Sequence, residues 1–207
     1  MGELTGNIRI YFVIALSLAF LFFAIAFRKS ENPTARFLVR ISTVTFIAIV
    51  VVFGILRPFV LGTAIIPSDS MSPTLHEGDQ VIVNKIIYKY TEPAYGDVIV
   101  FKAPPRISSG KEGDDYIKRI VGLPGDLLEI KDHTLYRNGE PVDEPFIKEP
   151  MKDAMWPRIV PNGKIFVMGD NRNNSFDSRD WGPFDQNLII GRVKMIIWPP
   201  NRRELIQ

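Results

Sequence analysis

Residues 135–142 read Leu135-Tyr136-Arg137-Asn138-Gly139-Glu140-Pro141-Val142 and contain the strongest turn signal in the chain. Two short runs of residues stand on either side of the Asn-Gly pair at the centre of this stretch. Asn-Gly suits a type I′ turn, because both central residues of that turn need positive φ angles. The sequence therefore predicts a tight β-hairpin here and, with it, an antiparallel sheet.

Similar runs of β-branched and apolar residues extend on both sides of this hairpin. Bordered by Gly-Asp or by prolines, they lie at residues 81–83, 98–101, 127–130, 165–168 and 193–198. No window of residues 67–207 shows a sustained 3.6-residue apolar period with helix caps. We therefore predict a mainly β domain, built as folded antiparallel sheets or a partly closed barrel.

The first third of the chain has a different composition. Residues 1–66 carry six Lys/Arg against two Asp/Glu, whereas residues 67–207 carry 19 against 21. A membrane-spanning helix needs about 20 mostly apolar residues, and we predict two such helices at about 10–27 and 38–56. A cleaved signal peptide followed by a buried core helix is the alternative, because residues 24–26 read Ala-Ile-Ala, a small-x-small spacing.

The connection between the two apolar runs predicts their orientation. It holds Arg28, Lys29, Arg36 and Arg40 against Glu31. Because Lys and Arg concentrate in cytoplasmic loops, we place this connection in the cytoplasm and both chain ends outside. The predicted organisation is a membrane anchor at 1–57, with a cytoplasmic loop at 28–37, and an extracytoplasmic β-rich domain at 58–207.

Composition also excludes several classes of function. The soluble part has no basic excess with which to neutralise phosphates, so nucleic acid is not an expected partner. The chain has no cysteine, which excludes disulfides, thiolate catalysis and Cys-ligated zinc. His76 and His133 are too far apart to suggest a metal site. We therefore expect no metal and no cofactor.

Three segments are too specific to serve only as connections, and they lie at 67–75, 115–126 and 169–182. The first is rich in serine, and a serine nucleophile needs a base. His76 is near, but its surroundings read as a solvated turn. Lys118 is the other candidate, because in a strand it would share a face with Tyr116 and Ile120, and burial lowers the pKa of a lysine. A lysine reaching solvent from a strand edge remains the alternative.

The three segments resemble the signature blocks of the type I signal peptidases, or leader peptidases, which are membrane-bound Ser–Lys endopeptidases. The block Ser-x-Ser-Met-x-Pro-Thr-Leu matches residues 68–75. Tyr-x-Lys-Arg-x-x-Gly-x-Pro-Gly-Asp matches residues 116–126, and Gly-Asp-Asn-x-x-x-Ser-x-Asp-Ser-Arg matches residues 169–179. About 42 residues separate the second and third blocks, so the additional β-domain of larger relatives is absent or vestigial.

The resemblance implies a role for individual residues. Ser70 matches the nucleophile and Lys118 the general base. Ser68 matches a serine whose hydroxyl forms the oxyanion hole together with the Ser70 backbone N–H. Ser175 matches the serine that orients the lysine, while Asp177 and Arg179 match a structural ion pair. Asp170 and Arg172 are interpreted as structural.

The resemblance also implies shallow pockets for small side chains. Their lining matches Ile66, Met71, Leu75, Tyr116 and Ile117. Ala64 replaces a larger side chain that some relatives have, so the pocket for the third residue before the cut is expected to be wider.

The function implied is a membrane-anchored serine endopeptidase that cleaves N-terminal signal peptides from exported preproteins. Its implied location is the cell membrane, crossed more than once, with the catalytic domain on the outer face. Preproteins and the lipid bilayer are the expected partners, and the export channel is a further candidate. The alternatives are a self-cleaving Ser–Lys relative of the repressor type and a non-catalytic membrane-tethered β-domain.

Overall fold

The computed structural model describes residues 22, 25, 32–52, 60–104 and 115–206. The chain divides into two compact units, Met1–Val60 and Leu61–Gln207. The predicted first span at 10–27 lies outside the described residues except for Phe22 and Ile25, both of which are helical.

Helix α2 (Pro33–Ile49) forms most of the described part of the N-terminal unit and continues as a π-helical turn to Val52. Asn32 caps it, because its side chain accepts a hydrogen bond from Thr34 N at 2.9 Å. Pro33 follows at the start of the helix, where the missing N–H of proline is tolerated. The helix thus begins at residue 33, five residues before the span predicted at about 38–56, and the cytoplasmic placement of residues 28–37 stays a prediction.

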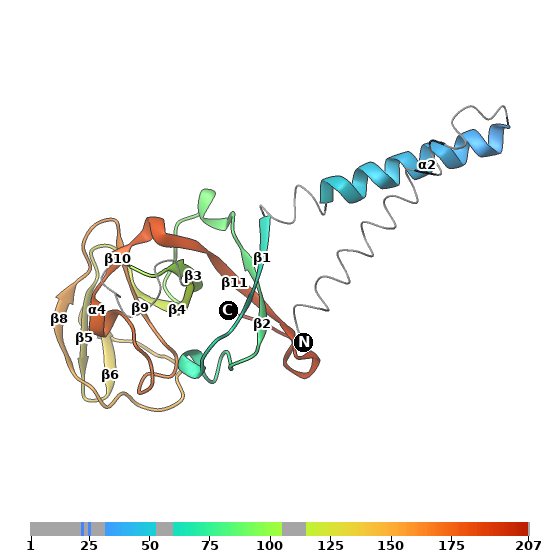
Figure 1. Cartoon of the computed structure of the whole chain (residues 1–207). Helices are drawn as coiled ribbons and strands as arrows, with labels where there is room; N and C mark the ends of the chain where they lie inside the picture. Colours follow the sequence, from blue (N-terminus) through green and yellow to red (C-terminus); the bar gives the residue numbers. More distant parts are fainter. Residues whose placement is uncertain (1–21, 23–24, 26–31, 53–59, 105–114, 207) are drawn as a thin grey trace. The chain divides into compact units, whose positions relative to one another are not determined.

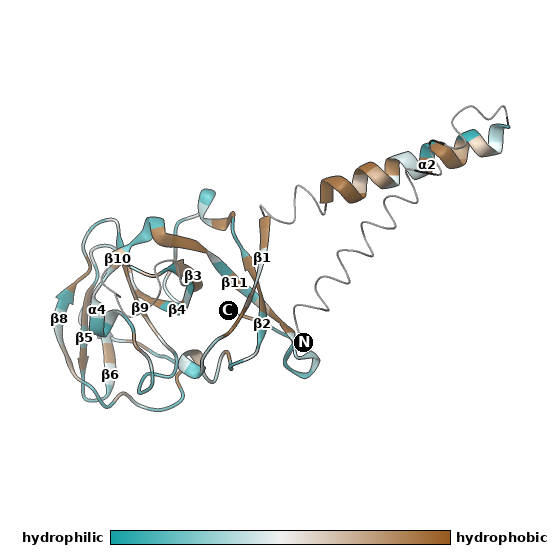
Figure 2. Ribbon diagram, in the orientation of Figure 1, coloured by the Kyte–Doolittle hydropathy of each residue, from teal (hydrophilic) through white to brown (hydrophobic). Residues whose placement is uncertain are grey.

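The surface of α2 is apolar over most of its length, as Figure 2 shows. Pro33–Val52 has 20 residues, and at 1.5 Å per residue it is about 30 Å long. Ser42 and Thr43 donate their hydroxyls to Val39 O at 3.0 and 2.8 Å, which satisfies these groups inside the helix. Among the described residues this is the one helix long and apolar enough to span a bilayer.

The second unit contains a large antiparallel sheet in the order β1-β2-β11-β3-β4-β9-β10, with β12 added beside β11 (Figure 1). Its strands are β1 (Leu61–Ile65), β2 (Gln80–Asn84), β3 (Val98–Lys102), β4 (Asp115–Gly122), β9 (Lys164–Met168), β10 (Phe184–Asp185), β11 (Ile189–Trp198) and β12 (Glu204–Leu205). The long strand β11 pairs with both β2 and β3, with register shifts along its length. The sheet is a half-barrel, which fits the predicted partly closed β architecture.

A smaller antiparallel sheet has the order β7-β6-β5-β8. Its strands are β5 (Leu127–Lys131), β6 (Thr134–Arg137), β7 (Glu140–Pro141) and β8 (Met155–Ile159). Asn138 and Gly139 join β6 to β7 with φ angles of 56° and 87°. The predicted type I′ hairpin is therefore confirmed.

Short helices lie in the connections of this unit. They are α4 (Ser178–Trp181), η2 (Asp69–Met71), η3 (Ile87–Lys89), η4 (Gln186–Leu188) and η5 (Pro200–Arg202). None extends beyond four residues, in keeping with the absence of a helical period in the sequence.

Strand β4 joins three apolar clusters of the second unit. Ile117 belongs to the cluster under β1, β2 and β11, and Val121 belongs to the one shared with the smaller sheet. Ile120 belongs to a third cluster, which contains the stacked rings of Phe101 and Phe184 with centroids 4.4 Å apart. Strand β4 is therefore covered on both faces, and a polar side chain on it is held away from water.

Candidate active site

Ser70 lies in the 3-10 turn η2, in the segment that links β1 to β2. The turn closes through a hydrogen bond from Ser72 N–H to Asp69 O at 3.0 Å. Ser68 precedes the turn with extended backbone angles, and its Oγ donates to Ser70 Oγ at 3.3 Å. The Met71 side chain is only 1% exposed, so it fixes the turn to the apolar core. The turn therefore holds the two serine hydroxyls next to each other.

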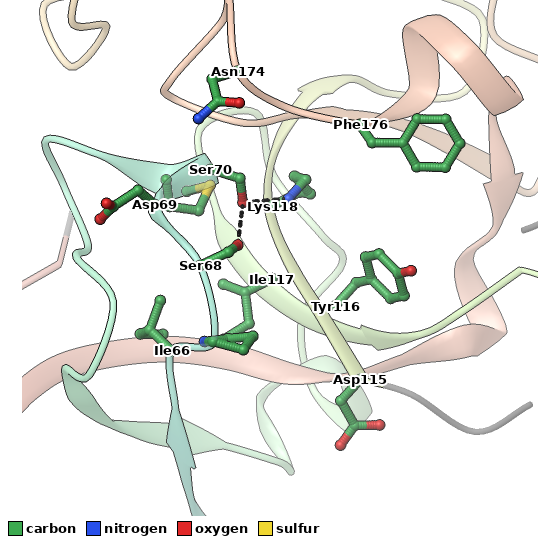
Figure 3. A pocket seen from close by; sticks show the side chains of 12 residues that line it. Ile66, Ser68, Asp69, Ser70, Asp115, Tyr116, Ile117, Lys118, Asn174 and Phe176 are labelled. Atoms are coloured by element: carbon green, nitrogen blue, oxygen red, sulfur yellow. Dashed lines mark hydrogen bonds between the residues drawn. The ribbon is translucent and has the colours of Figure 1, made fainter. Parts of the chain in front are cut away.

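Lys118 reaches Ser70 from the middle of β4. The strand pairs with β3 along Asp115–Arg119, where Lys118 lies opposite Ile99, and with β9 from Arg119 onward. Lys118 is 4% exposed and is the only buried lysine in the described part of the chain. Its Nζ lies 2.7 Å from Ser70 Oγ, and Figure 3 shows this contact beside the one from Ser68. The alternative of a lysine reaching solvent from a strand edge is therefore excluded.

Burial lowers the pKa of the Lys118 ammonium from 10.5 to about 8, because the charged form loses its hydration. The Asp177 and Asp170 carboxylates oppose this shift, and the Arg179 guanidinium adds to it. A substantial fraction of Lys118 is therefore a neutral amine at mildly alkaline pH. Such an amine can accept a proton from a hydroxyl at hydrogen-bond distance.

The end of β9 comes very close to the Ser70 turn. A Cβ built on Gly169 would collide with Ser70 O and with Ser175 Oγ, so only glycine permits this approach. The Ser175 hydroxyl is buried and has no hydrogen-bond partner in the described part of the chain. The structure shows no bond from it to Lys118, and its orienting role stays a prediction.

Asp177 and Arg179 form an ion pair beside this approach. Arg179 Nε donates to Asp177 Oδ1 at 2.9 Å, and the Asp177 side chain is completely buried. The other oxygen of Asp177 accepts the Gly169 N–H at 3.0 Å. Asp177 also caps α4, because Asp177 and Asp180 exchange a reciprocal pair of side-chain to backbone bonds. One carboxylate thus fixes the end of β9 and the loop that carries Ser175.

Two more buried ion pairs lie near the site, and one of them is on the strand that carries Lys118. Arg119 Nη2 lies 2.7 Å from Asp170 Oδ2, and Arg172 Nη2 lies 2.7 Å from Glu144 Oε1. The ring of Phe146 packs against the Arg119 guanidinium, with its centroid 3.9 Å from Cζ. The segment after β7 therefore supports the site from the side of the smaller sheet. Nothing in the sequence pattern identified Glu144 or Phe146, because their partners lie far away in the chain.

Ser70 and Lys118 open into a cleft of about 600 Å³. It is lined by Ile66, Pro67, Ser68, Asp69, Ser70, Met71, Asp115, Tyr116, Ile117, Lys118, Asn174 and Phe176. Four of the five residues predicted to bind substrate are on this surface. The exception is Leu75, which is fully buried in the apolar cluster that also contains Met71. Ala64 packs against the same cluster and does not line the cleft.

The cleft also contains residues to which the sequence had assigned no role. Asp69, Asp115, Asn174 and Phe176 lie within or next to the three matched segments, so their position in the chain was the available signal. Figure 3 shows Phe176 and Tyr116 on one side of the Ser70–Lys118 contact. His76 is not part of the lining. Its ring is 41% exposed and lies 3.7 Å from Asp69, as expected for a solvated turn.

A family model and several individual proteins, all of them peptidases, match this chain. The family model described as signal peptidase, peptidase S26, matches residues 38–198. "Probable signal peptidase I-1" of Synechocystis sp. is 43% identical over 150 residues, which cover 72% of this chain and 76% of that protein. "Signal peptidase I S" of Bacillus subtilis is 37% identical over 187 residues, covering 84% of this chain and 96% of that one.

A plant protein matches over a shorter part of its own length. "Thylakoidal processing peptidase 1, chloroplastic" of Arabidopsis thaliana is 44% identical over 142 residues, which cover 66% of this chain and 42% of that protein. The family match includes α2 from residue 38 and all three segments that build the cleft. The chain therefore belongs to the signal peptidase I family, peptidase S26, the membrane-anchored serine peptidases that cleave signal peptides from preproteins.

Proposed function

We propose that Ser70 is the nucleophile of this peptidase and that Lys118 is its general base. The observation that carries the proposal is the 2.7 Å contact between Ser70 Oγ and the buried Lys118 Nζ. Burial supplies the lowered pKa that a lysine base needs, and the cleft gives a peptide access to both groups. His76, the other candidate base, does not line the cleft.

The reaction would follow the usual course of acyl transfer to serine. Ser70 Oγ attacks the scissile carbonyl carbon while its proton passes to the neutral Nζ of Lys118. The Ser70 N–H and the Ser68 hydroxyl, 3.3 Å from Ser70 Oγ, stabilise the oxyanion. The C–N bond then breaks as Lys118 returns the proton to the leaving amine. Water, deprotonated by Lys118, hydrolyses the ester and frees Ser70.

The substrate would be a peptide with small side chains at the first and third positions before the cut. Ile66, Met71 and Ile117 give the cleft an apolar lining next to Ser70. These three side chains belong to one packed cluster, so a large side chain could enter only by displacing it. Peptides with Ala before the cut should be cleaved far faster than matched peptides with Phe, and equal kcat/KM values for the two would contradict this.

The membrane arrangement proposed here has two spans, at about 10–27 and within 33–56, with the peptidase unit on the outer face. Support comes from the exposed apolar surface of α2 and from the basic residues that precede it. Ser70 follows Leu56 by 14 residues, so the chain between them can reach at most about 50 Å. A signal peptide leaves the bilayer at the membrane surface, and the export channel is a candidate neighbour.

The test is cleavage of an exported preprotein by the purified full chain in detergent, with the cut mapped by mass spectrometry. Ser70→Ala and Lys118→Ala should each abolish turnover while the melting temperature stays close to that of the wild type. Lys118→Arg should also be inactive, because guanidinium stays protonated in proteins.

His76→Ala is the control and should leave the cleavage rate nearly unchanged. Loss of activity in His76→Ala together with retention in Lys118→Ala would overturn the Ser–Lys assignment.

A further inference from the structure

We propose that Asn171 is a positioning residue that aims the Ser70 N–H at the oxyanion of the transition state. The inference rests on the proposed role of Ser70, and it gives a role to a residue of the third matched segment for which the resemblance implied none. Asn171 follows Gly169-Asp170 beyond the end of β9 and is 7% exposed. It touches neither Lys118 nor the Ser70 hydroxyl through any hydrogen bond in the described part of the chain.

Asn171 holds the peptide groups on both sides of Ser70. Its side-chain Nδ2 donates to Asp69 O at 3.1 Å, and its backbone N–H donates to Ser70 O at 3.1 Å. Asp69 O also accepts the Ser72 N–H that closes the turn. The two carbonyls that flank the Ser70 Cα are therefore both fixed, and one residue contributes to both.

The side-chain bond determines where the Ser70 N–H points. The Asp69 carbonyl and the Ser70 N–H belong to one planar trans peptide group, so they point in opposite directions. A donor that holds the Asp69 carbonyl therefore also fixes the direction of the Ser70 N–H. Without Asn171 Nδ2, the carbonyl would keep only the bond within the turn, and the peptide plane would be freer to rotate.

A positioning role of this kind affects the transition state more than the bound substrate. The negative oxygen that the N–H stabilises develops only as Ser70 attacks, so poorer alignment lowers kcat and changes KM little. Removing an oxyanion-hole donor outright costs about 10²- to 10³-fold in kcat. A donor that is present but misaligned should cost less, about 10- to 100-fold.

The experiment measures kcat and KM of the purified full chain in detergent, on a peptide that spans a signal-peptide cleavage site. Asn171→Ala removes the side-chain donor but keeps the backbone bond to Ser70 O. We expect kcat to fall about 10- to 100-fold, KM to change less than about threefold, and the pH midpoint of kcat/KM to stay in place. Asn171→Asp retains the side-chain size, loses the donor and should show a similar loss in kcat.

Asn173→Ala is the matched control. Asn173 lies in the same loop and makes the same kind of bonds, from Nδ2 to Pro150 O at 3.0 Å and from Lys152 N to Oδ1 at 2.9 Å, but it does not contact the Ser70 turn. Its kcat should stay within about twofold of the wild type. Melting temperatures measured on all variants separate a loss of fold from a loss of alignment.

The inference is overturned if Asn171→Ala and Asn171→Asp keep wild-type kcat, or if Asn173→Ala loses as much. It is also overturned if the loss appears in KM, or if the pH midpoint of Asn171→Ala moves, which would indicate an effect on Lys118. Failure of the underlying proposal is distinguishable, because Ser70→Ala would then remain active.

Discussion

Lys118 can act as a base only in its neutral form, and its surroundings determine the pH at which that form appears. Burial removes water from the ammonium, and the carboxylates of Asp177 and Asp170 restore only part of the lost stabilisation. Both carboxylates are engaged by arginines, through Arg179 and Arg119 respectively. Their charges are thereby partly neutralised, and the desolvation of Lys118 prevails.

The activity should therefore rise with pH. With the pKa of Lys118 lowered to about 8, protonated enzyme predominates below that pH and is inactive. We expect kcat/KM to rise about tenfold per pH unit between pH 5 and 7 and to level off above about pH 9. Initial rates on a peptide substrate across this range provide the measurement. A flat profile from pH 5 to 9 would contradict a titrating lysine base.

Some residues of the site could be identified from the sequence, and others only from the structure. Ser70 and Lys118 stand in contiguous segments whose residue types and spacing point to Ser–Lys chemistry. Phe146 stands outside the three matched segments and contacts Arg119 from a distant part of the chain. Asn171 lies inside the third segment, but its bond to Asp69 O joins it to a turn 102 residues away. Such contacts depend on how β4, β9 and the segment after β7 pack together. A pattern read along one strand does not contain that information.

The same distinction applies to secondary structure. The β6–β7 hairpin was predictable because Asn138-Gly139 determines its turn locally. Strand β1 was not predicted, and it lies at the edge of the sheet with glycine at its second position. Strand β8 was also missed, because Pro157 stands at its centre and proline argues against an interior strand. It is in fact the last strand of its sheet, where proline is tolerated.

The close approach between the end of β9 and the η2 turn can be tested at Gly169. A Cβ there would collide with the backbone at Ser70 O as well as with Ser175. Backbone cannot move aside as a side chain can, so Gly169→Ala should displace the Ser70 turn. We expect kcat/KM to fall by at least about tenfold and the melting temperature to drop by several degrees, as overpacking a core costs about 1–3 kcal/mol.

Gly62→Ala is the control for this substitution. Its Cβ would meet only the flexible end of the Lys85 side chain, which can swing away. Activity and melting temperature should both remain close to wild type. If Gly169→Ala behaved like Gly62→Ala, the close packing of β9 on the turn would not be needed for activity.

The two units differ in how much of their apolar side-chain surface they bury. The β unit packs many of its apolar residues into three buried clusters. Helix α2 does the opposite, since large side chains such as Phe37, Val44 and Ile47 are more than half exposed. In water this exposure would be unfavourable, whereas in a bilayer the same side chains contact lipid. An N-terminal membrane anchor follows from that surface.

The number of spans is a prediction about the whole molecule that cysteine labelling can test, because the native chain has no cysteine. Two spans with a basic connection inside place Ser30 in the cytoplasm and Thr5 outside. In intact cells an impermeant thiol reagent should label Thr5→Cys and spare Ser30→Cys, which should react only after permeabilisation. Tyr90→Cys, at a position 81% exposed in the peptidase unit, reports the outer face and should react in intact cells.

The labelling pattern distinguishes an anchor of two membrane spans from an anchor of one. A single span through α2, with the peptidase unit outside, would leave Thr5 and Ser30 together in the cytoplasm, and both variants would then be protected. Two spans require opposite results at these positions, because the apolar run between them would cross the bilayer. Labelling of Ser30→Cys in intact cells would contradict both arrangements, since the four basic residues around it would then face outward against the positive-inside preference.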